Sequence, residues 1–170
     1  MVTEHYGLNA VAWEGAEMAE KLFKYRPNAY HHVTFATKRR KLILTGAIRE
    51  RVHYWFGQLA QEHDFQLLEY NTWLEHAHML IFVRIGEDLS YVMNILKGTC
   101  AFNIFREFDD LKMQIHENHL WGGRFHAEEV PADAIEAVRR YIRDQEQIHG
   151  ERASLLPIAA WERWRDLDEL

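Results

Sequence analysis

Two short elements of this 170-residue sequence carry side chains suited to metal binding and phosphoryl chemistry. His76 and His78 stand two residues apart in a strand-like run, so both imidazoles point from one face of that strand. Tyr141 and Gln145 stand four residues apart in a helix-like run and share a face of that helix. If the two faces meet, two imidazoles and an amide oxygen would hold a divalent metal, Mg²⁺ or Mn²⁺, beside a tyrosine hydroxyl. Such a site is suited to cutting a phosphodiester bond through a covalent protein intermediate.

Basic residues gather in a run from Lys38 to Lys41 and again around Tyr141, and they are suited to holding phosphate groups. The residues expected to contact DNA are Lys38, Arg39, Arg40, Lys97, Arg139, Arg140 and Arg143. The net charge of −6 argues against a general nucleic-acid binder, because phosphate neutralisation dominates non-specific affinity. A local phosphate-binding surface is compatible with that charge. The run from Lys38 to Lys41, taken alone, is equally compatible with a solvated turn.

Length and composition indicate one globular domain. With 170 residues and 48% hydrophobic side chains, the chain can bury a core without covalent cross-links. Its single cysteine, Cys100, excludes an internal disulfide framework and a cysteine-based zinc cluster. No apolar run approaches the roughly 20 residues that span a bilayer, and the first residues lack the basic and apolar regions of a signal peptide. We therefore expect a cytoplasmic protein that makes no membrane contact.

The hydrophobic pattern predicts a helical extension at 1–28, a domain at 29–150 and a helical tail at 151–170. Within the domain, the expected elements are a strand at 29–37, a helix at 45–60, strands at 65–73 and 76–84, a helix at 88–105, a loop with a short strand at 120–126, and a helix at 131–150. This order matches an α+β, ferredoxin-like split βαβ core with one antiparallel sheet and two helices on one face. The last helix, which carries Tyr141, would return across the open face of the sheet.

Several other polar residues near these elements are weaker candidates. His31 and His32 point to opposite faces of the first strand, so at most one of them approaches the site. Glu75 directly precedes His76, and strict alternation would point its side chain to the opposite face. The remaining candidates, which lie in or after a polar loop, are His116, His119 and His126.

Five separated motifs, taken in order from Tyr30 to Gln145, resemble a known family. They are Tyr30-His31-His32-Val33-Thr34-Phe35-Ala36-Thr37-Lys38, Glu75-His76-Ala77-His78-Met79-Leu80-Ile81, Leu96-Lys97-Gly98, Leu120-Trp121 and Tyr141-Ile142-x-x-Gln145. Together they resemble the single-tyrosine HUH transposases of small bacterial insertion sequences, including relatives associated with repetitive extragenic palindromes. Two positions depart from that pattern: Glu75 stands where the family usually has aspartate, and Ala77 where it often has a larger aliphatic residue.

The resemblance implies a ferredoxin-like enzyme that acts as a homodimer on single-stranded DNA with hairpins. By the same resemblance, His76, His78 and Gln145 bind the metal, and Tyr141 attacks the scissile phosphate. The products are a 5′-phosphotyrosine and a free 3′-hydroxyl, which strand transfer later rejoins. In the family the tyrosine helix can dock on the partner subunit, which would make the site a composite of two copies.

Other functions remain open from the sequence alone. One is a non-catalytic, domesticated protein that binds hairpin DNA or structured RNA. Another is a metal-dependent phosphoesterase that acts on small substrates with His76 and His78, while Tyr141 only positions the substrate. A third is an interaction module whose metal site is incidental. For the individual residues, the alternatives are a packed or exposed histidine pair and a half-buried aromatic on an amphipathic helix.

Overall fold

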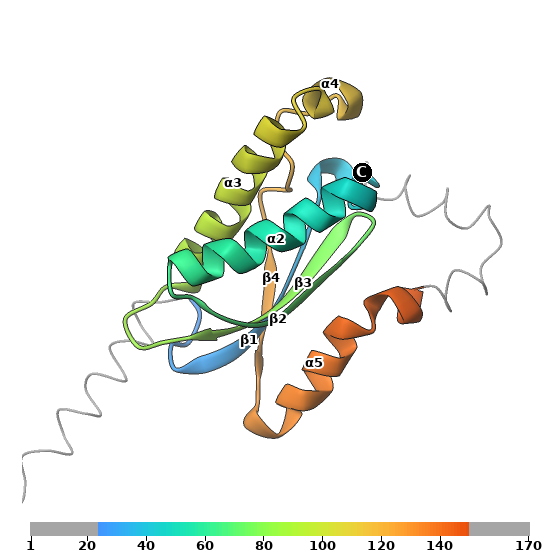
Figure 1. Cartoon of the computed structure of the whole chain (residues 1–170). Helices are drawn as coiled ribbons and strands as arrows, with labels where there is room; N and C mark the ends of the chain where they lie inside the picture. Colours follow the sequence, from blue (N-terminus) through green and yellow to red (C-terminus); the bar gives the residue numbers. More distant parts are fainter. Residues whose placement is uncertain (1–23, 150–170) are drawn as a thin grey trace, which may run out of the picture.

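The computed structural model describes residues 24–149, whose elements follow the order expected from the sequence (Figure 1). The strands are β1 (Ala29–Ala36), β2 (Gln66–Trp73), β3 (His76–Val83) and β4 (His126–Val130). The helices are α2 (Gly46–Glu62), α3 (Leu89–Glu107), α4 (Leu111–Ile115) and α5 (Ile135–Arg143), with 3-10 turns at Lys38–Arg40 and Ala132–Ala134. None of the helices in this part of the chain is long and apolar enough to cross a lipid bilayer.

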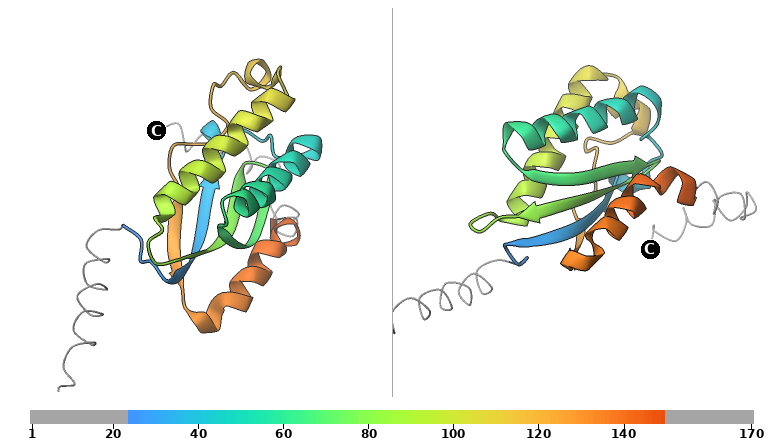
Figure 2. Two further views of the ribbon diagram at one scale, coloured as in Figure 1. Left: turned by 60° about the vertical axis from the view of Figure 1, so that its left-hand side comes forward. Right: turned by 60° about the horizontal axis from the view of Figure 1, so that its bottom comes forward.

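The four strands form one antiparallel sheet in the order β2-β3-β1-β4. Helices α2 and α3 cover one face of this sheet, and α5 crosses the opposite face (Figure 2). This is the ferredoxin-like arrangement, with the tyrosine-bearing helix on the open face. The α+β fold expected from the sequence is therefore confirmed.

The main core lies between the sheet and the helices α2 and α3. Alternate residues of β1, including Val33 and Phe35, are buried against the helices, as are Met79 and Ile81 of β3. Residues at helical spacing complete this core: Val52, Phe56 and Leu59 from α2, and Met93, Leu96, Cys100 and Ile104 from α3. The period of two in the strands and of about 3.6 in the helices thus explains both layers.

A second, smaller core lies on the face covered by α5. Its fully or nearly buried members are Leu80, Val130 and Ile142. Around them pack the partly buried Tyr30, Leu68, Ala134, Ile135 and Val138. A β-bulge at Leu68 interrupts the register between Leu67 and Glu69. A bulge re-aims side chains locally, and here Leu68 joins the apolar contact under α5.

Three elements differ from the sequence predictions by more than a shift of one or two residues at their ends. β4 begins at His126, and the expected segment at 120–126 forms only an isolated bridge between Thr37 and Trp121. The short helix α4 was not predicted; it forms because Leu111 and Ile115, four residues apart, are both buried. The final helix ends at Arg143, seven residues short of the expected 150. The predicted helical extension at 1–28 lies outside the described residues up to 23, and so does the predicted tail at 151–170.

We predict that Ile142→Ala lowers the free energy of unfolding by about 2–4 kcal/mol, because the substitution leaves a cavity under α5. Ile142 is 0% exposed, whereas Ile85, which is 79% exposed, provides a matched control. Urea unfolding of both variants measures the effect, and Ile85→Ala should change stability by less than about 0.5 kcal/mol. Equal effects would show that α5 does not pack on this sheet.

Stability should also depend on pH through His53, which lies between α2 and β2 and whose Nε2 is 2.8 Å from Thr72 Oγ1. Burial, with a smaller effect from Arg49, lowers the pKa of His53 to about 4. The unfolded chain therefore binds this proton more readily, and stability falls as the pH drops from about 6.5 toward 4. Between pH 7 and pH 5, the wild type should lose about 1–2 kcal/mol more than His53→Gln. Urea titrations check this, with the exposed His119→Gln as control; equal losses in wild type and His53→Gln would contradict it.

Candidate active site

Strand alternation places His76 and His78 on the face of β3 that α5 covers, as the sequence predicted. Their rings lie 5.1 Å apart at an interplanar angle of 83°. His32, on the neighbouring strand β1, joins them: its Nε2 lies 2.9 Å from Nδ1 of His78. The sequence allowed one of His31 and His32 near the site, and the structure brings His32 there. His31 instead faces the other side, where its Nε2 lies 2.9 Å from the carbonyl oxygen of Arg26.

Each histidine of the pair has one ring nitrogen held by a neighbour. Glu75 Oε1 lies 3.1 Å from Nδ1 of His76, while His32 engages Nδ1 of His78. Within residues 24–149, Nε2 of His76 and of His78 takes part in no hydrogen bond, so both remain open to a ligand. The expectation that Glu75 points away from His76 was wrong. Glu75 lies in the turn before β3, where strand alternation does not apply.

The surroundings of His78 and of His32 favour the neutral form of these two imidazoles. Burial lowers the pKa of His78 to about 3, and His76, His32 and His149 lower it further. Burial also lowers the pKa of His32, an effect that Glu128 opposes. A neutral imidazole offers a lone pair to a metal, whereas a protonated one does not. At neutral pH His78 is therefore in the form that a metal ligand requires.

Tyr141 lies directly above this group of histidines. Its ring centroid is 5.6 Å from that of His78 and 5.9 Å from that of His32, with both pairs edge to face. The side chain is 40% exposed, so the phenol stands between the histidines and the solvent. The structure thus brings together, within one chain, the tyrosine and the histidine pair that the sequence singled out.

The helix that carries Tyr141 does not continue to Gln145. It ends at Arg143, Asp144 is a non-helical turn residue, and residues 145–149 form a further helical turn. The sequence prediction of one continuous helix face was therefore wrong. Gln145 is nevertheless fully buried, and its Nε2 donates to the carbonyl oxygen of Tyr141 at 2.8 Å.

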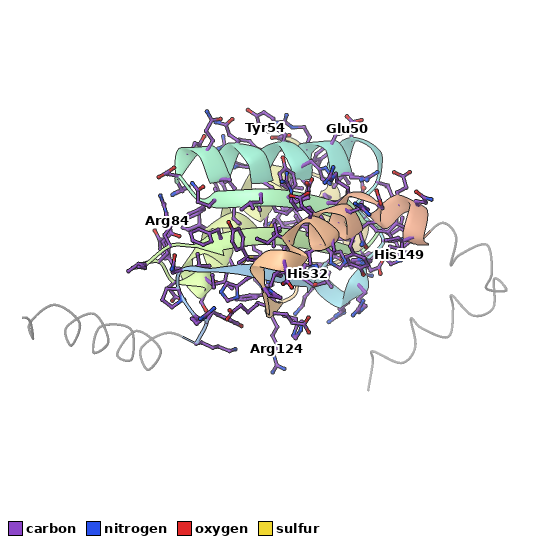
Figure 3. The ribbon with its side chains drawn as sticks, turned by 90° about the horizontal axis from the view of Figure 1, so that it is seen from below. His32, Glu50, Tyr54, Arg84, Arg124 and His149 are labelled. Carbon is purple, nitrogen blue, oxygen red and sulfur yellow. The ribbon has the colours of Figure 1, made fainter. Side chains whose placement is uncertain are left out.

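His149 is a further member of the group that the sequence analysis missed. Its Nε2 lies 3.0 Å from Oε1 of Gln145, and its ring lies 4.9 Å from that of His76. It stacks on Trp73 with centroids 5.6 Å apart at 8°. In Figure 3, His32 and His149 lie on the side of the sheet that carries α5, whereas Tyr54 lies on the opposite side, on α2. The spacing of four residues from Gln145 would have been the signal for His149.

The side chains of His76, His78 and Gln145 meet only some of the requirements of a metal site. Imidazoles that bind one metal through nitrogens about 2.1 Å away have ring centroids roughly 5 Å apart, and the separation of His76 and His78 is 5.1 Å. Within residues 24–149, no three His, Cys, Asp or Glu side chains form a group that would hold a metal. A site here depends on the amide oxygen of Gln145 as third ligand, and that oxygen contacts His149.

The basic residues expected to contact DNA divide into two groups near the site. The turn Lys38–Arg40 follows β1, whose Ala36 pairs with His76, so it lies at the histidine end of the sheet. In this turn, Arg39 forms an ion pair with Glu117.

On α5, Arg139 and Arg143 both pair with Glu69 of β2, at 3.5 and 3.3 Å. Those ion pairs direct both arginines to the sheet, whereas the side chain of Arg140 is exposed.

Lys97 lies apart from the site. Its Nζ donates to the carbonyl oxygens of Gly122 and Arg124, at 2.8 and 3.1 Å. It also lies over the ring of Phe35, which belongs to the core side of the sheet. Lys97 therefore holds the loop before β4, and its contact with DNA remains a prediction. Among the other candidates, His126 contacts Glu128 at 3.0 Å at the edge of the sheet.

Comparison with known proteins points to one family. A family model described as transposase IS200 like matches residues 25–145. The chain is 26% identical over 132 residues to the transposase of insertion sequence IS200 from Salmonella typhimurium, covering 76% of this chain and 86% of that protein. It is 19% identical over 115 residues to the transposase TnpA of ISDra2 from Deinococcus radiodurans, covering 68% and 82%.

Two solved structures share the fold. One is the crystal structure of a candidate transposase from Deinococcus radiodurans, with a TM-score of 0.57 and 22% identity over 72% of this chain and 94% of that one. The other is a REP-associated tyrosine transposase bound to a REP hairpin, with a TM-score of 0.55 and 16% identity over 74% and 71%. At these identities the two structures support the fold alone.

Proposed function

Because this chain belongs to the family of IS200-like transposases, we propose that it cuts and rejoins single-stranded DNA through a 5′-phosphotyrosine at Tyr141. The observation that carries this proposal is the position of Tyr141, whose ring lies 5.6 Å from His78 and is exposed on its outer side. A phenol in this position is accessible to a DNA strand on one side and close to neutral imidazoles on the other. We also propose that the protein works in the cytoplasm, where its DNA substrate would be found.

In the proposed reaction, the phenolic oxygen of Tyr141, which is exposed to solvent, attacks the scissile phosphorus as its proton passes to water. A bond forms between the tyrosine oxygen and phosphorus, and the bond from phosphorus to the 3′ oxygen breaks. The departing oxygen takes a proton and becomes a 3′-hydroxyl. Because the phosphotyrosine keeps the energy of the broken diester, attack by another 3′-hydroxyl rejoins DNA and releases Tyr141.

Among the residues around Tyr141, some would bind the metal and others orient the histidines. His76, His78 and Gln145 would hold Mg²⁺ or Mn²⁺, which would stabilise charge on the phosphate oxygens. His32 and Glu75 hold the inner nitrogens of His78 and His76, and so fix which nitrogen of each ring faces the site. The amide oxygen of Gln145 lies 3.0 Å from Nε2 of His149, and its second lone pair would be the one that binds the metal.

Hairpin DNA is the proposed substrate. One relative of the same fold is a REP-associated tyrosine transposase bound to a REP hairpin. The turn Lys38–Arg40 lies at the histidine end of the sheet and would contact the phosphates beside the cleaved strand. A homodimer is proposed as the assembly that holds two DNA ends. In the structure of a single chain, Tyr141 meets His78 of the same polypeptide.

One observation favours a second candidate, a hairpin-binding protein that has lost catalysis. The amide oxygen of Gln145 is engaged by His149, and no acidic residue completes a metal group within residues 24–149. The covalent intermediate distinguishes the two candidates, because only the transposase forms it.

We predict that the wild type forms a covalent adduct with labelled single-stranded DNA taken from the ends of its own locus, in Mn²⁺ or Mg²⁺. Tyr141→Phe should lower adduct formation by at least about 1,000-fold, since it removes the nucleophile. Tyr91→Phe is the matched control, because Tyr91 is an exposed tyrosine on α3. A denaturing gel reads out the adduct. Hairpin binding without any adduct would favour the non-catalytic candidate.

Metal binding gives a separate prediction. His78→Ala and Gln145→Ala should each weaken Mn²⁺ binding by at least about 10-fold, because each removes one of three ligands. Electron paramagnetic resonance of Mn²⁺ measures the affinity directly, without DNA. His119→Ala is the control, since His119 is exposed and lies outside the site. Unchanged affinity in Gln145→Ala would remove the glutamine from the proposed ligand set.

A further inference from the structure

Because α5 ends at Arg143, the carbonyl groups at its end accept hydrogen bonds from side chains. The last carbonyl groups of a helix have no helical N–H donors. In α5 these groups belong to Tyr141, Ile142 and Arg143. Gln145 Nε2 donates to the first, and Nδ2 of Asn71 lies 3.0 Å from each of the other two. Asn71 belongs to β2, so a residue of the sheet caps the helix that carries Tyr141.

The other side of the Asn71 amide fixes its orientation. Its Oδ1 accepts from the backbone N–H of Thr72 at 2.9 Å and from Nη2 of Arg49 at 3.2 Å. Both neighbours are donors, so the oxygen must face them and the NH₂ group must face α5. Both the NH₂ group and the oxygen of Asn71 therefore have hydrogen-bond partners only in this orientation.

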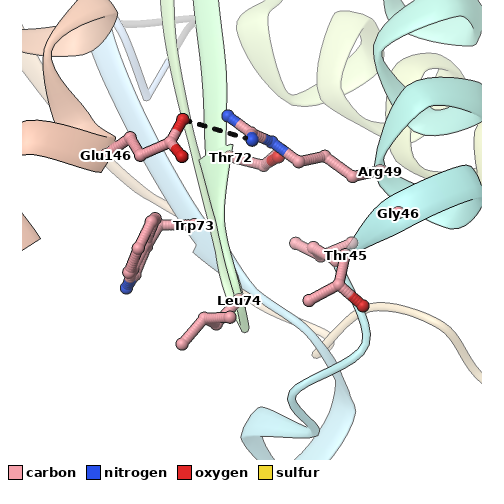
Figure 4. A pocket seen from close by; sticks show the side chains of 8 residues that line it. Thr45, Gly46, Arg49, Thr72, Trp73, Leu74 and Glu146 are labelled. Carbon is pink, nitrogen blue, oxygen red and sulfur yellow. Dashed lines mark ion pairs between the residues drawn. The ribbon is translucent and has the colours of Figure 1, made fainter. Parts of the chain in front are cut away.

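Arg49 extends the same connection across the helix break. Its Nη1 forms an ion pair with Glu146 at 3.5 Å, and Glu146 lies two residues beyond the break at Asp144 (Figure 4). Arg49 comes from α2, on the opposite side of the sheet from α5. One chain of polar contacts thus joins α2, β2 and both parts of the C-terminal helical segment.

The position of Asn71 relates this cap to the histidines. In the sheet register Asn71 pairs directly with His78. Residues opposite one another on neighbouring strands point from the same face, with Cβ atoms about 5 Å apart. The carbonyl groups directly after Tyr141 are therefore tied to the residue beside His78. This contact fixes the end of α5 against the row of the sheet that carries His78.

We propose that Asn71 is a positioning residue for the reaction, which holds Tyr141 over His78 by capping the broken end of α5. This role rests on the proposed function of Tyr141 as nucleophile. Asn71 itself touches no reacting atom. A misplaced nucleophile costs mainly rate: an error of about 1 Å can lower catalysis by about 100-fold. Loss of the cap should thus slow the chemical step more than it weakens DNA binding.

The test compares Asn71→Asp with the wild type. Aspartate keeps the shape of the side chain but replaces both N–H donors by an oxygen, which repels the two carbonyl groups. Asn94→Asp is the matched control, because Asn94 is exposed on α3 and undergoes the same change of charge. Asn71→Ala provides a second, uncharged variant if the aspartate prevents folding. Adduct formation is measured over a range of DNA concentrations, and amide hydrogen exchange is measured in α5 and α3 without DNA.

Asn71→Asp should lower the maximal rate of adduct formation by about 30- to 100-fold, with the half-saturating DNA concentration changed less than threefold. Exchange should accelerate in residues 135–143 and stay unchanged in α3. A maximal rate within threefold of the wild type would overturn the proposal. So would faster exchange throughout the core together with weaker DNA binding, since Asn71 would then only support the fold.

Different results would overturn covalent catalysis by Tyr141 and the positioning role of Asn71. Absence of an adduct with the wild-type protein would overturn the proposed function, and the catalytic role of Asn71 with it. The exchange measurement would still decide whether Asn71 caps α5. A normal wild-type adduct with unaffected Asn71 variants would overturn only the positioning role.

Discussion

The antiparallel register between β1 and β3 is the constraint on which the rest of this structure depends. It pairs Thr34 with His78 and Ala36 with His76, and so brings His32 beside the histidine pair. In the same register Val33 and Met79 face the helices α2 and α3. A slip of one residue in either strand would turn its histidines into the apolar core and its apolar residues toward α5. Burial of the core therefore selects the register that assembles the site.

The face of the sheet under α5 carries both an apolar contact with this helix and the group of histidines. Leu80, Val130 and Ile142 bury the contact with α5, and each such side chain contributes about 1.5–3 kcal/mol. Ile142 is adjacent to Tyr141 in sequence, so the anchored residue holds its neighbour at the border between the apolar contact and the histidines. Because α5 has only nine residues, its own hydrogen bonds contribute little and packing on the sheet holds it.

Much of this arrangement could be predicted from the sequence because two periodicities are clear. Alternation in β3 placed both histidines on one face, and the apolar stripes of α2 and α3 predicted their packing on the other. Residue types allow either Asp88 or Ser90 as the cap of α3, and the structure has Asp88, which accepts from the N–H of Ser90. The meeting of Tyr141 with His78 followed from the order of the elements, once the last helix was assumed to return across the sheet.

The remaining features depend on contacts that local sequence does not encode. Nothing in the run from Arg143 to Gln145 marks the helix break, since neither glycine nor proline is present. That break is stabilised from outside by Asn71, which is about 70 residues away in sequence. Glu75 approaches His76 because Leu74, with a φ of 44°, turns the chain just before β3. The ion pairs of Glu69 with Arg139 and Arg143 likewise require the tertiary fold.

Because α5 docks on the sheet of its own chain, this contact depends on protein concentration differently from a contact between two copies. Where Tyr141 meets His78 of its own chain, as in this structure, the contact forms in a unimolecular step that is coupled to folding. The fraction of molecules with an assembled site is then independent of protein concentration, whereas a site shared between two copies would be lost on dilution.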